Sequence, residues 1–185
     1  MQGIRPTGTA PAISRCCWQL APAALLEALP ALGAVLYVPK QPRWPAYRPM
    51  PRGLLAEDAV LAPLLQTHWL LAASVVTSEG PREWVECVDR HGHLRARLYL
   101  LPDTDYLAWD MLLAGGKPVA VPMQAWWPRN GRSGSAQLLR FHVRRLAGLR
   151  VLGCETAMSV SALSRHLAER VAGVEALSWR PMPYG

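Results

Sequence analysis

The stretch from Arg82 to Leu113, REWVECVDRHGHLRARLYLLPDTDYLAWDMLL, contains the signals that decide the fold of this 185-residue chain. It turns at Asp89-Arg90-His91-Gly92-His93, and from Leu94 to Leu100 apolar and polar side chains alternate. Alternation with a period of two beside a glycine-containing turn is typical of a β-hairpin with one buried face. The pattern therefore predicts two antiparallel strands here.

A helix is predicted directly after this hairpin. Asp103-Thr104-Asp105 supplies an N-cap, and Gly115-Gly116 ends the helix. The apolar residues between them recur at spacings of three and four: Tyr106, Trp109, Leu112 and Leu113. Because the sheet face and the helix stripe must both leave water, the hairpin and the helix should form a compact α+β unit.

Three further segments carry a secondary-structure signal. Pro22 opens a helix with a leucine stripe that ends at Gly33, and residues 34–38 follow as a short strand. A continuous apolar run from Thr67 to Val76 predicts a central strand that is buried on both faces. Since the hairpin follows this strand at once, we expect an antiparallel meander sheet with helices packed on one face.

The length and the apolar content, 51%, suit one domain. We expect residues 1–15 to be a disordered tail and residues 16–185 to be a single α+β domain. This domain has three expected parts: a sheet-forming repeat at 16–116, a proline-rich linker at 117–136 and a C-terminal helical part at 137–185. Within the last part, Gln137 to Val151 fits either a strand or helices broken near His142, and a helix is predicted from Ser161 to Ala172.

The charge balance limits the possible partners. The chain has 20 Lys and Arg residues against 13 Asp and Glu, a formal charge of +7 that comes mainly from arginine. Guanidinium groups pair with planar carboxylates and phosphates, so the surface should attract anionic ligands, nucleic acid or an acidic partner. A basic surface that is merely solvated explains the same composition equally well.

Several protein classes lack their usual signals in this sequence. No run approaches the ~18 apolar residues of a membrane span, and no secretion signal is present, so we expect a cytoplasmic protein. The four cysteines include no C-x-x-C pair, so the sequence indicates neither a disulfide framework nor a zinc site. Because phosphate loops and nucleophile motifs are also absent from the sequence, we favour a protein that is not an enzyme.

Several segments, in order along the chain, resemble the bacterial cytoplasmic haem-utilisation proteins of the HemS/HmuS family and their single-repeat ChuX/HutX-like relatives. The first is the leucine-rich helix, glycine and strand of Leu25 to Leu36, and the tryptophan-bearing strand at Trp69 follows it. The next are the Asp89 to Gly92 turn, with Arg97-Leu98-Tyr99-Leu100 after it, and the helix start from Asp103 to Trp109. The last segment, Leu138 to Arg150, is similar to the helical opening of the family's second repeat.

The resemblance implies a HemS/ChuX-like α+β fold and a haem-binding protein, either a cytoplasmic haem carrier or an accessory factor in iron acquisition. Arg97 stands where the family has a lysine, which makes it a candidate for binding a haem propionate. The family's usual axial histidine precedes the second-repeat opening, and that place here reads Arg132-Ser133-Gly134-Ser135. Any haem site must therefore use another iron ligand, together with an apolar slot and basic groups.

His142 and His166 are the best replacement ligands. His142 follows the lost position closely and is flanked by Arg140 and Arg144, whose guanidinium groups would meet the propionates. His166 comes one helical turn before Arg170, so this pair would share a helix face toward a cleft. For each histidine, the plain alternative is a surface or capping role among solvated arginines.

Two other groups of residues have alternative explanations. Cys154 and Met158 would present soft ligands on one face if their segment is helical, although core packing explains them more simply. Trp44, Trp126 and Trp127, in proline-rich segments, would stack on a planar ligand or a partner, or would tie loops to the sheet.

Three functions follow, in decreasing order of support. The first is the haem carrier, for which we expect a homodimer, because two single-repeat chains would restore the paired sheets of the two-repeat proteins. The second is a protein-interaction module that has kept the fold without binding haem. The third, nucleic-acid binding, rests on charge alone.

Overall fold

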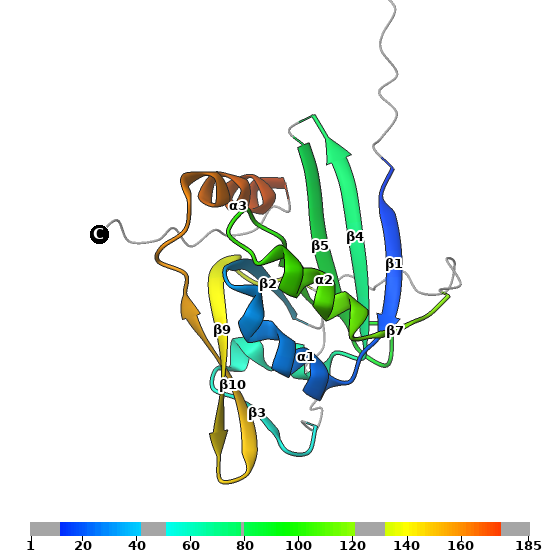
Figure 1. Ribbon diagram of the computed structural model, residues 1–185, viewed down its shortest axis with the longest axis vertical. Coiled ribbons are helices and arrows are strands. Elements are labelled where there is room, and N and C mark those ends of the chain that lie inside the picture. The colour runs from blue at the N-terminus through cyan, green and yellow to red at the C-terminus, as the bar shows by residue number, and fades with distance from the viewer. Residues whose placement is uncertain (1–11, 42–50, 79, 121–131, 175–185) are drawn as a thin grey trace, which may run out of the picture.

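The computed structural model describes residues 12–41, 51–78, 80–120 and 132–174. The described chain is α+β, with one large, mostly antiparallel sheet and a few helices (Figure 1). None of the helices in these ranges combines the length and the apolar character that a bilayer crossing requires. The prediction of an α+β fold is confirmed.

The sheet contains ten strands within the described residues, in the order β3-β10-β9-β2-β6-β5-β4-β1-β7, with β8 paired to β2. All of the pairings are antiparallel except β3 with β10. The strands are β1 Ser14–Gln19, β2 Val35–Gln41, β3 Leu54–Ala56, β4 Trp69–Thr77, β5 Gly80–Val88, β6 Leu94–Tyr99, β7 Lys117–Pro118, β8 Arg132–Ser133, β9 Gln137–Leu146 and β10 Leu149–Thr156.

The predicted meander is present only in the middle of the sheet. Strands β4, β5 and β6 follow one another and pair as neighbours, and the hairpin turn lies at the predicted place between Val88 and Leu94. The sheet as a whole is not a simple meander. Strand β2 inserts beside β6, β9 and β10 continue beyond it, and β1 adds to the outer side of β4.

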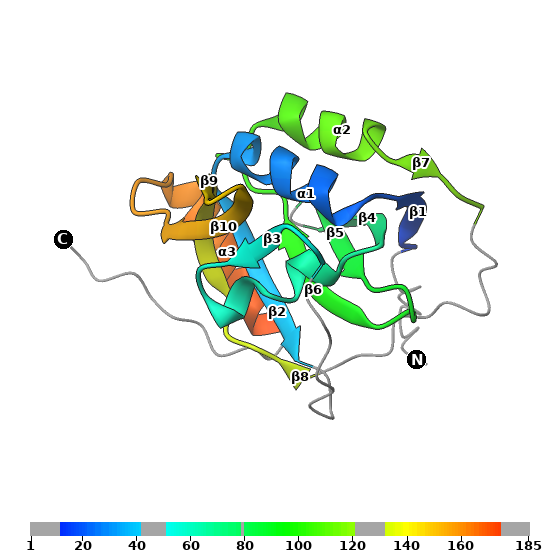
Figure 2. The same ribbon diagram turned by 90° about the horizontal axis from the view of Figure 1, so that it is seen from below.

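Helices cover both faces of the sheet, so the prediction of helices on one face is wrong. On one face lie α1 Pro22–Ala28, its 3-10 continuation Leu29–Leu32 and α2 Tyr106–Ala114; short 3-10 turns at Ala59–Leu61 and Leu64–Gln66 join the same core. The helix α3 Ala162–Val174 packs on the other face (Figure 2). Both faces are covered because β2 buries side chains on both of its sides. Tyr37 is buried in the core beneath α1 and α2, and Leu36 is buried in the core beneath α3.

The first half of the chain follows its sequence signals closely. The helix and 3-10 turn from Pro22 to Leu32 end at Gly33, whose φ of 70° is readily adopted by glycine. The side chain of Asp105 caps α2, because its carboxylate accepts a hydrogen bond from the Ala108 amide at 2.9 Å. The helix buries Trp109 and Leu112 against the sheet, as the spacing predicted.

Three sequence predictions need correction. Strand β4 is buried on both faces only near its start, at Leu70 and Leu71, and Val76 at its far end is 75% exposed. Residues from Gln137 to Thr156 form a β-hairpin, so the C-terminal part is helical only from Ala162. Ser14 and Arg15, expected in a disordered tail, begin β1, while residues 1–11 and most of the two proline-rich segments lie outside the described residues.

Candidate functional site

A cleft of about 400 Å³ lies at one end of the sheet, between α3, the start of β5 and the connection from β6 to α2. The residues that line it are Pro81, Arg82, Glu83, Leu100, Leu101, Pro102, Tyr106, Leu163, His166, Leu167 and Arg170. The volume falls within the range of small-molecule sites, and the walls combine aliphatic side chains with a few polar groups. This cleft is the candidate functional site.

The wall formed by α3 is fixed to the loop before α2 by a small network of hydrogen bonds. The backbone amide of Ser161 donates to Oδ2 of Asp103 at 2.6 Å, and the amide of Asp103 donates to Oγ of Ser164 at 3.2 Å. Ser161 also caps α3, since its Oγ accepts from the amide of Ser164 at 3.2 Å. Hydrogen bonds from Ser164 and Ser161 lower the pKa of Asp103, because they favour the ionised form of its carboxyl group.

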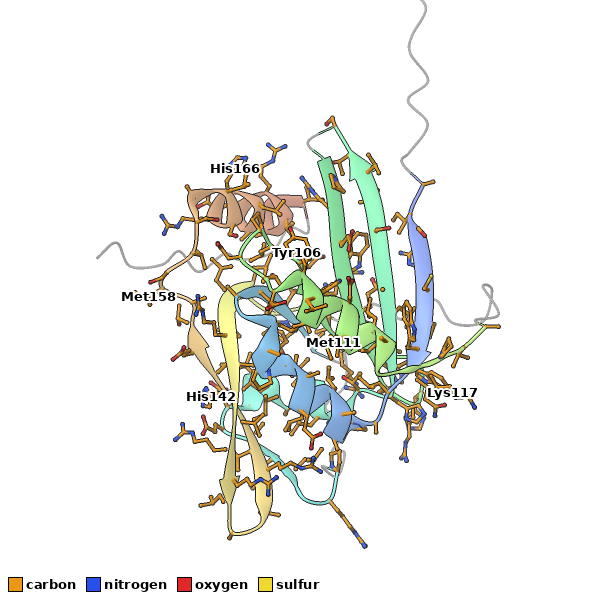
Figure 3. All side chains as sticks on the ribbon, in the orientation of Figure 1. Tyr106, Met111, Lys117, His142, Met158 and His166 are labelled. Carbon is orange, nitrogen blue, oxygen red and sulfur yellow. The ribbon has the colours of Figure 1, made fainter. Side chains whose placement is uncertain are left out.

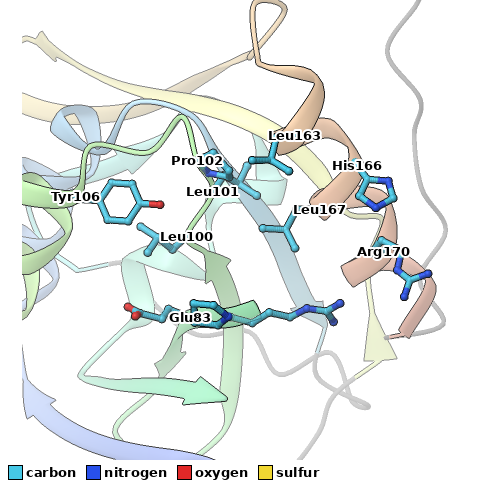
Figure 4. A pocket seen from close by; sticks show the side chains of 11 residues that line it. Glu83, Leu100, Leu101, Pro102, Tyr106, Leu163, His166, Leu167 and Arg170 are labelled. Carbon is cyan, nitrogen blue, oxygen red and sulfur yellow. The ribbon is translucent and has the colours of Figure 1, made fainter. Parts of the chain in front are cut away.

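The polar groups of the cleft come from its two opposite sides. Figure 4 shows Tyr106 on one side and His166 with Arg170 on the other, with Leu100 and Leu167 between them. His166 and Arg170 stand one turn apart on α3, while Tyr106, 57% exposed, is the first residue of α2. An imidazole, a phenol and a guanidinium group therefore border one apolar slot.

The imidazole, phenol and guanidinium groups suit a planar anionic ligand that carries a metal, whereas the carboxylate of Glu83, which also lines the cleft, would repel an anionic group placed beside it. Imidazole nitrogen and phenolate oxygen are both axial ligands for haem iron in proteins. Guanidinium groups such as those of Arg82 and Arg170 match the geometry of a carboxylate. The aliphatic side chains of Leu163 and Leu167 offer apolar contact to the face of a ring, so the residues present are compatible with haem.

The structure places the other predicted iron ligand, His142, far from this cleft. His142 is on β9, and Figure 3 shows it well apart from His166. Its Nε2 lies 3.3 Å from Oε2 of Glu57, and the two side chains meet above Gly153, which has no side chain to separate them. The imidazole is thus already engaged with a carboxylate on the surface of the hairpin.

The three predicted propionate-binding arginines also lie outside the cleft. Arg97 donates to Oε1 of Glu86 from Nε at 3.0 Å and from Nη2 at 2.9 Å, within the sheet. Arg144 pairs with Glu57 at 2.9 Å on the hairpin. Arg140 lies opposite Glu155 in the pairing of β9 with β10. Of the predicted site residues, only His166 lines the cleft, and Arg170 joins it as the sequence spacing suggested.

The soft-ligand pair does not form. Cys154 lies in β10 rather than in a helix, so no helical face joins it to Met158. Burial raises the pKa of the Cys154 thiol, which packs against the core. No cluster of three or more His, Cys, Asp or Glu residues that would hold a metal occurs in the described ranges. Trp44, Trp126 and Trp127 lie outside those ranges.

Sequence reasoning missed several residues of the cleft. The spacing of apolar residues places Tyr106 in the buried stripe of α2, yet in the structure its side chain is exposed and lines the cleft. Arg82 and Glu83 open β5 and carried no local signal for a binding site. Three separate segments meet here, and the pairing of β5 with β6 together with the packing of α3 on the sheet brings them together.

No protein-family model and no curated protein matches the chain. Similar solved structures include holo-PhuS and apo-PhuS, the two forms of a haem-binding protein from Pseudomonas aeruginosa, with 22% and 20% sequence identity and a TM-score of 0.35 for each. The matches cover 66% of this chain and 40% and 39% of the PhuS chains. The chain thus spans about two fifths of the length of PhuS, and it is a weak structural neighbour of that protein.

Proposed function

We propose that this protein binds haem in the cleft beside α3 and serves as a cytoplasmic carrier or accessory factor in haem and iron utilisation. The observation that carries the proposal is the position of His166 and Arg170, side by side on the wall of an apolar cleft. The ordered resemblance of the sequence to the haem-utilisation proteins supports the same conclusion. In this proposal, His166 replaces the axial histidine that the sequence lacks at residues 132–135.

Five side chains of the cleft have a defined part in this proposal. His166 supplies the imidazole for iron, and Arg170 with Arg82 attracts the propionate carboxylates. Leu163 and Leu167 exclude water from the ring face, which strengthens the charged contacts at the rim. When bound, haem supplies an iron centre whose ligation state gives a visible absorbance signature.

A homodimer is the second part of the proposal. The two-repeat proteins of the resembled family hold two sheets in one chain, whereas this chain supplies one sheet in its described residues. Two copies would bring two such sheets into one assembly, and we expect a twofold axis because it is the commonest way for identical chains to close an assembly.

Titration with hemin, followed at the Soret band, tests the haem site. The wild-type protein should shift the band of free hemin, and His166→Ala should abolish the shift or weaken binding at least about tenfold. His142→Ala is the matched control, because it removes an exposed imidazole paired to Glu57 outside the cleft. Its spectrum should match that of the wild type.

The outcomes separate three possibilities. Loss of the shift with His142→Ala alone would move the site to the β9–β10 hairpin and refute the cleft. If wild-type and free hemin spectra coincide, haem binding fails altogether. The chain would then be better described as a protein-interaction module of this fold, with the surface arginines Arg140, Arg144 and Arg145 as its first candidates for a protein contact.

A further inference from the structure

The outward face of α1 carries no unpaired charge, although the protein as a whole has a net charge of +7. Its exposed positions are Ala21, Ala24, Glu27, Pro30 and Ala31, counting the 3-10 turn that continues it. Glu27, the one charged residue among them, forms an ion pair with Arg150 of β10. What α1 presents to solvent is therefore a surface of small apolar side chains.

The neighbouring helix α2 extends this surface with larger apolar residues. Leu107 is 71% exposed and Met111 is 65% exposed, and they lie one helical turn apart. Ala114 is exposed as well, whereas Asp110 is the exposed charge beside them. We call these exposed residues of α1, its 3-10 turn and α2 the α1–α2 face. Exposed apolar residues that gather on neighbouring elements, with polar residues around them, are typical of contact sites in soluble proteins.

We propose that the α1–α2 face is the surface on which a second copy of this chain packs. The inference rests on the homodimer proposed above and names its interface. Two chains of charge +7 repel each other, so the approach costs least where the surface carries no net positive charge. Charged residues are depleted and methionine is enriched at the centre of protein interfaces, and Met111 with Leu107 supplies the large apolar side chains of this face.

A twofold axis through α1 also brings opposite charges together. Figures 1 and 2 both show α1 between α2 on one side and the tip of the β9–β10 hairpin on the other. Rotation about α1 therefore places the hairpin of each copy over α2 of its partner. Arg145, near that tip, lies two residues after Val143 and four after Phe141, and both of these pack into the core beneath α1 and α2. Residues two apart in a strand share a face, so Arg145 lies on the side of the sheet that carries these helices.

Arg145 and Asp110 are both exposed, and neither has an ion pair within the described part of the chain. In the proposed dimer each Arg145 faces the partner's Asp110, and the contact occurs twice because the interface is isologous. Complementary charges at the rim then set the orientation of the two copies, while the apolar residues of the α1–α2 face supply the contact area.

Sedimentation of exposed-surface variants tests this interface. The wild-type chain should be dimeric, and Ala24→Arg or Met111→Glu should weaken the dimer at least about tenfold, because each places a charge in the buried contact. Val76→Glu is the control, since Val76 is exposed at the far end of β4 and lies outside the α1–α2 face. A dimer that tolerates Ala24→Arg and Met111→Glu places the interface elsewhere and overturns the proposal.

A charge exchange sharpens the test. Asp110→Arg and Arg145→Asp should each weaken the dimer, and the double variant should recover much of the loss because the two charges have only changed places. Two additive losses in the double variant would refute the contact between the hairpin and α2. Folding of each variant is checked by circular dichroism.

The result is distinguishable from that of the haem proposal. Hemin titration of Ala24→Arg should remain at the wild-type value, because Ala24 is not among the residues that line the cleft. A chain that binds hemin but sediments as a monomer at every concentration refutes the dimer and its interface while it leaves the cleft proposal standing. A dimer without hemin binding refutes only the cleft.

Discussion

Two hairpins of the same sheet use similar residues in opposite ways. In the β5–β6 hairpin, the carboxylate of Asp89 is only 2% exposed and accepts from Arg95 through Nε at 2.9 Å and Nη2 at 2.5 Å. The backbone amides of His91 and His93 donate to its other oxygen at 2.8 and 3.0 Å. One buried carboxylate therefore holds the turn and the start of the next strand together.

The β9–β10 hairpin also joins a carboxylate, an arginine and a histidine, but near the surface. Glu57 is 33% exposed, with Arg144 at 2.9 Å and His142 at 3.3 Å. Water competes for every group of this cluster, so each contact contributes little free energy of folding. The difference between the hairpins shows that burial, rather than the kind of residue, separates a structural ion pair from a replaceable one.

Among the variants suggested by this comparison, replacement of Asp89 should have the largest effect on the free energy of unfolding. Asp89→Ala leaves the guanidinium group of Arg95, 6% exposed, without its carboxylate, and should lower the free energy of unfolding by about 3–5 kcal/mol. Denaturation by urea, followed by circular dichroism, measures the change. Glu57→Ala is the matched control and should cost less than about 1 kcal/mol, because its partners are solvated. Equal losses in the two variants would contradict the distinction between the hairpins.

The same carboxylate should make folding stability depend on pH in acid. Burial by itself would raise the pKa of Asp89, but hydrogen bonds from His93, Arg95 and His91 outweigh it and hold the pKa below 3.8. A carboxyl group whose folded pKa is depressed stabilises the fold fully above its unfolded value, and this contribution is lost as pH falls through the folded pKa. Wild type should therefore lose more stability than Asp89→Asn below pH 3.8. Parallel curves for the two proteins would show that Asp89 does not contribute.

The two hairpins also differ in how far sequence could predict them. The β5–β6 turn is local: Asp89 and Gly92 lie three residues apart, Gly92 has a φ of 79°, and strict alternation follows. The segment Gln137 to Val151 has leucines that suit a helix as well as a strand, and the pairing of β9 with β10, of β9 with β2 and of β10 with β3 decides in favour of strands. Tertiary contacts outweigh local preference there.

The candidate site was predictable only in part, for the same reason. His166 and Arg170 share a helix face, and a spacing of four residues shows this directly. No local pattern predicts the other wall of the cleft, which contains Arg82, Tyr106, Leu100 and Leu101. The pairing of β5 with β6 and the packing of α3 bring these residues to the cleft. From the sequence, His142 was as good a candidate as His166. In the structure it lies beside Glu57 and away from the cleft, because its strand, β9, is separated from β6 and β5 by β2.

The smallest expected effect concerns the tip of the β9–β10 hairpin. Leu146 pairs with Leu149, so Ala147 and Gly148 form a two-residue loop, with φ of 48° and 82°. Both values are positive, as a type I′ turn requires, and alanine is costly at the first position, where asparagine or glycine is preferred. Ala147→Asn should therefore raise the free energy of unfolding by about 0.5 kcal/mol. Urea denaturation beside Asp89→Ala measures it, and a loss of stability would mean that the hairpin tip does not adopt this turn in solution.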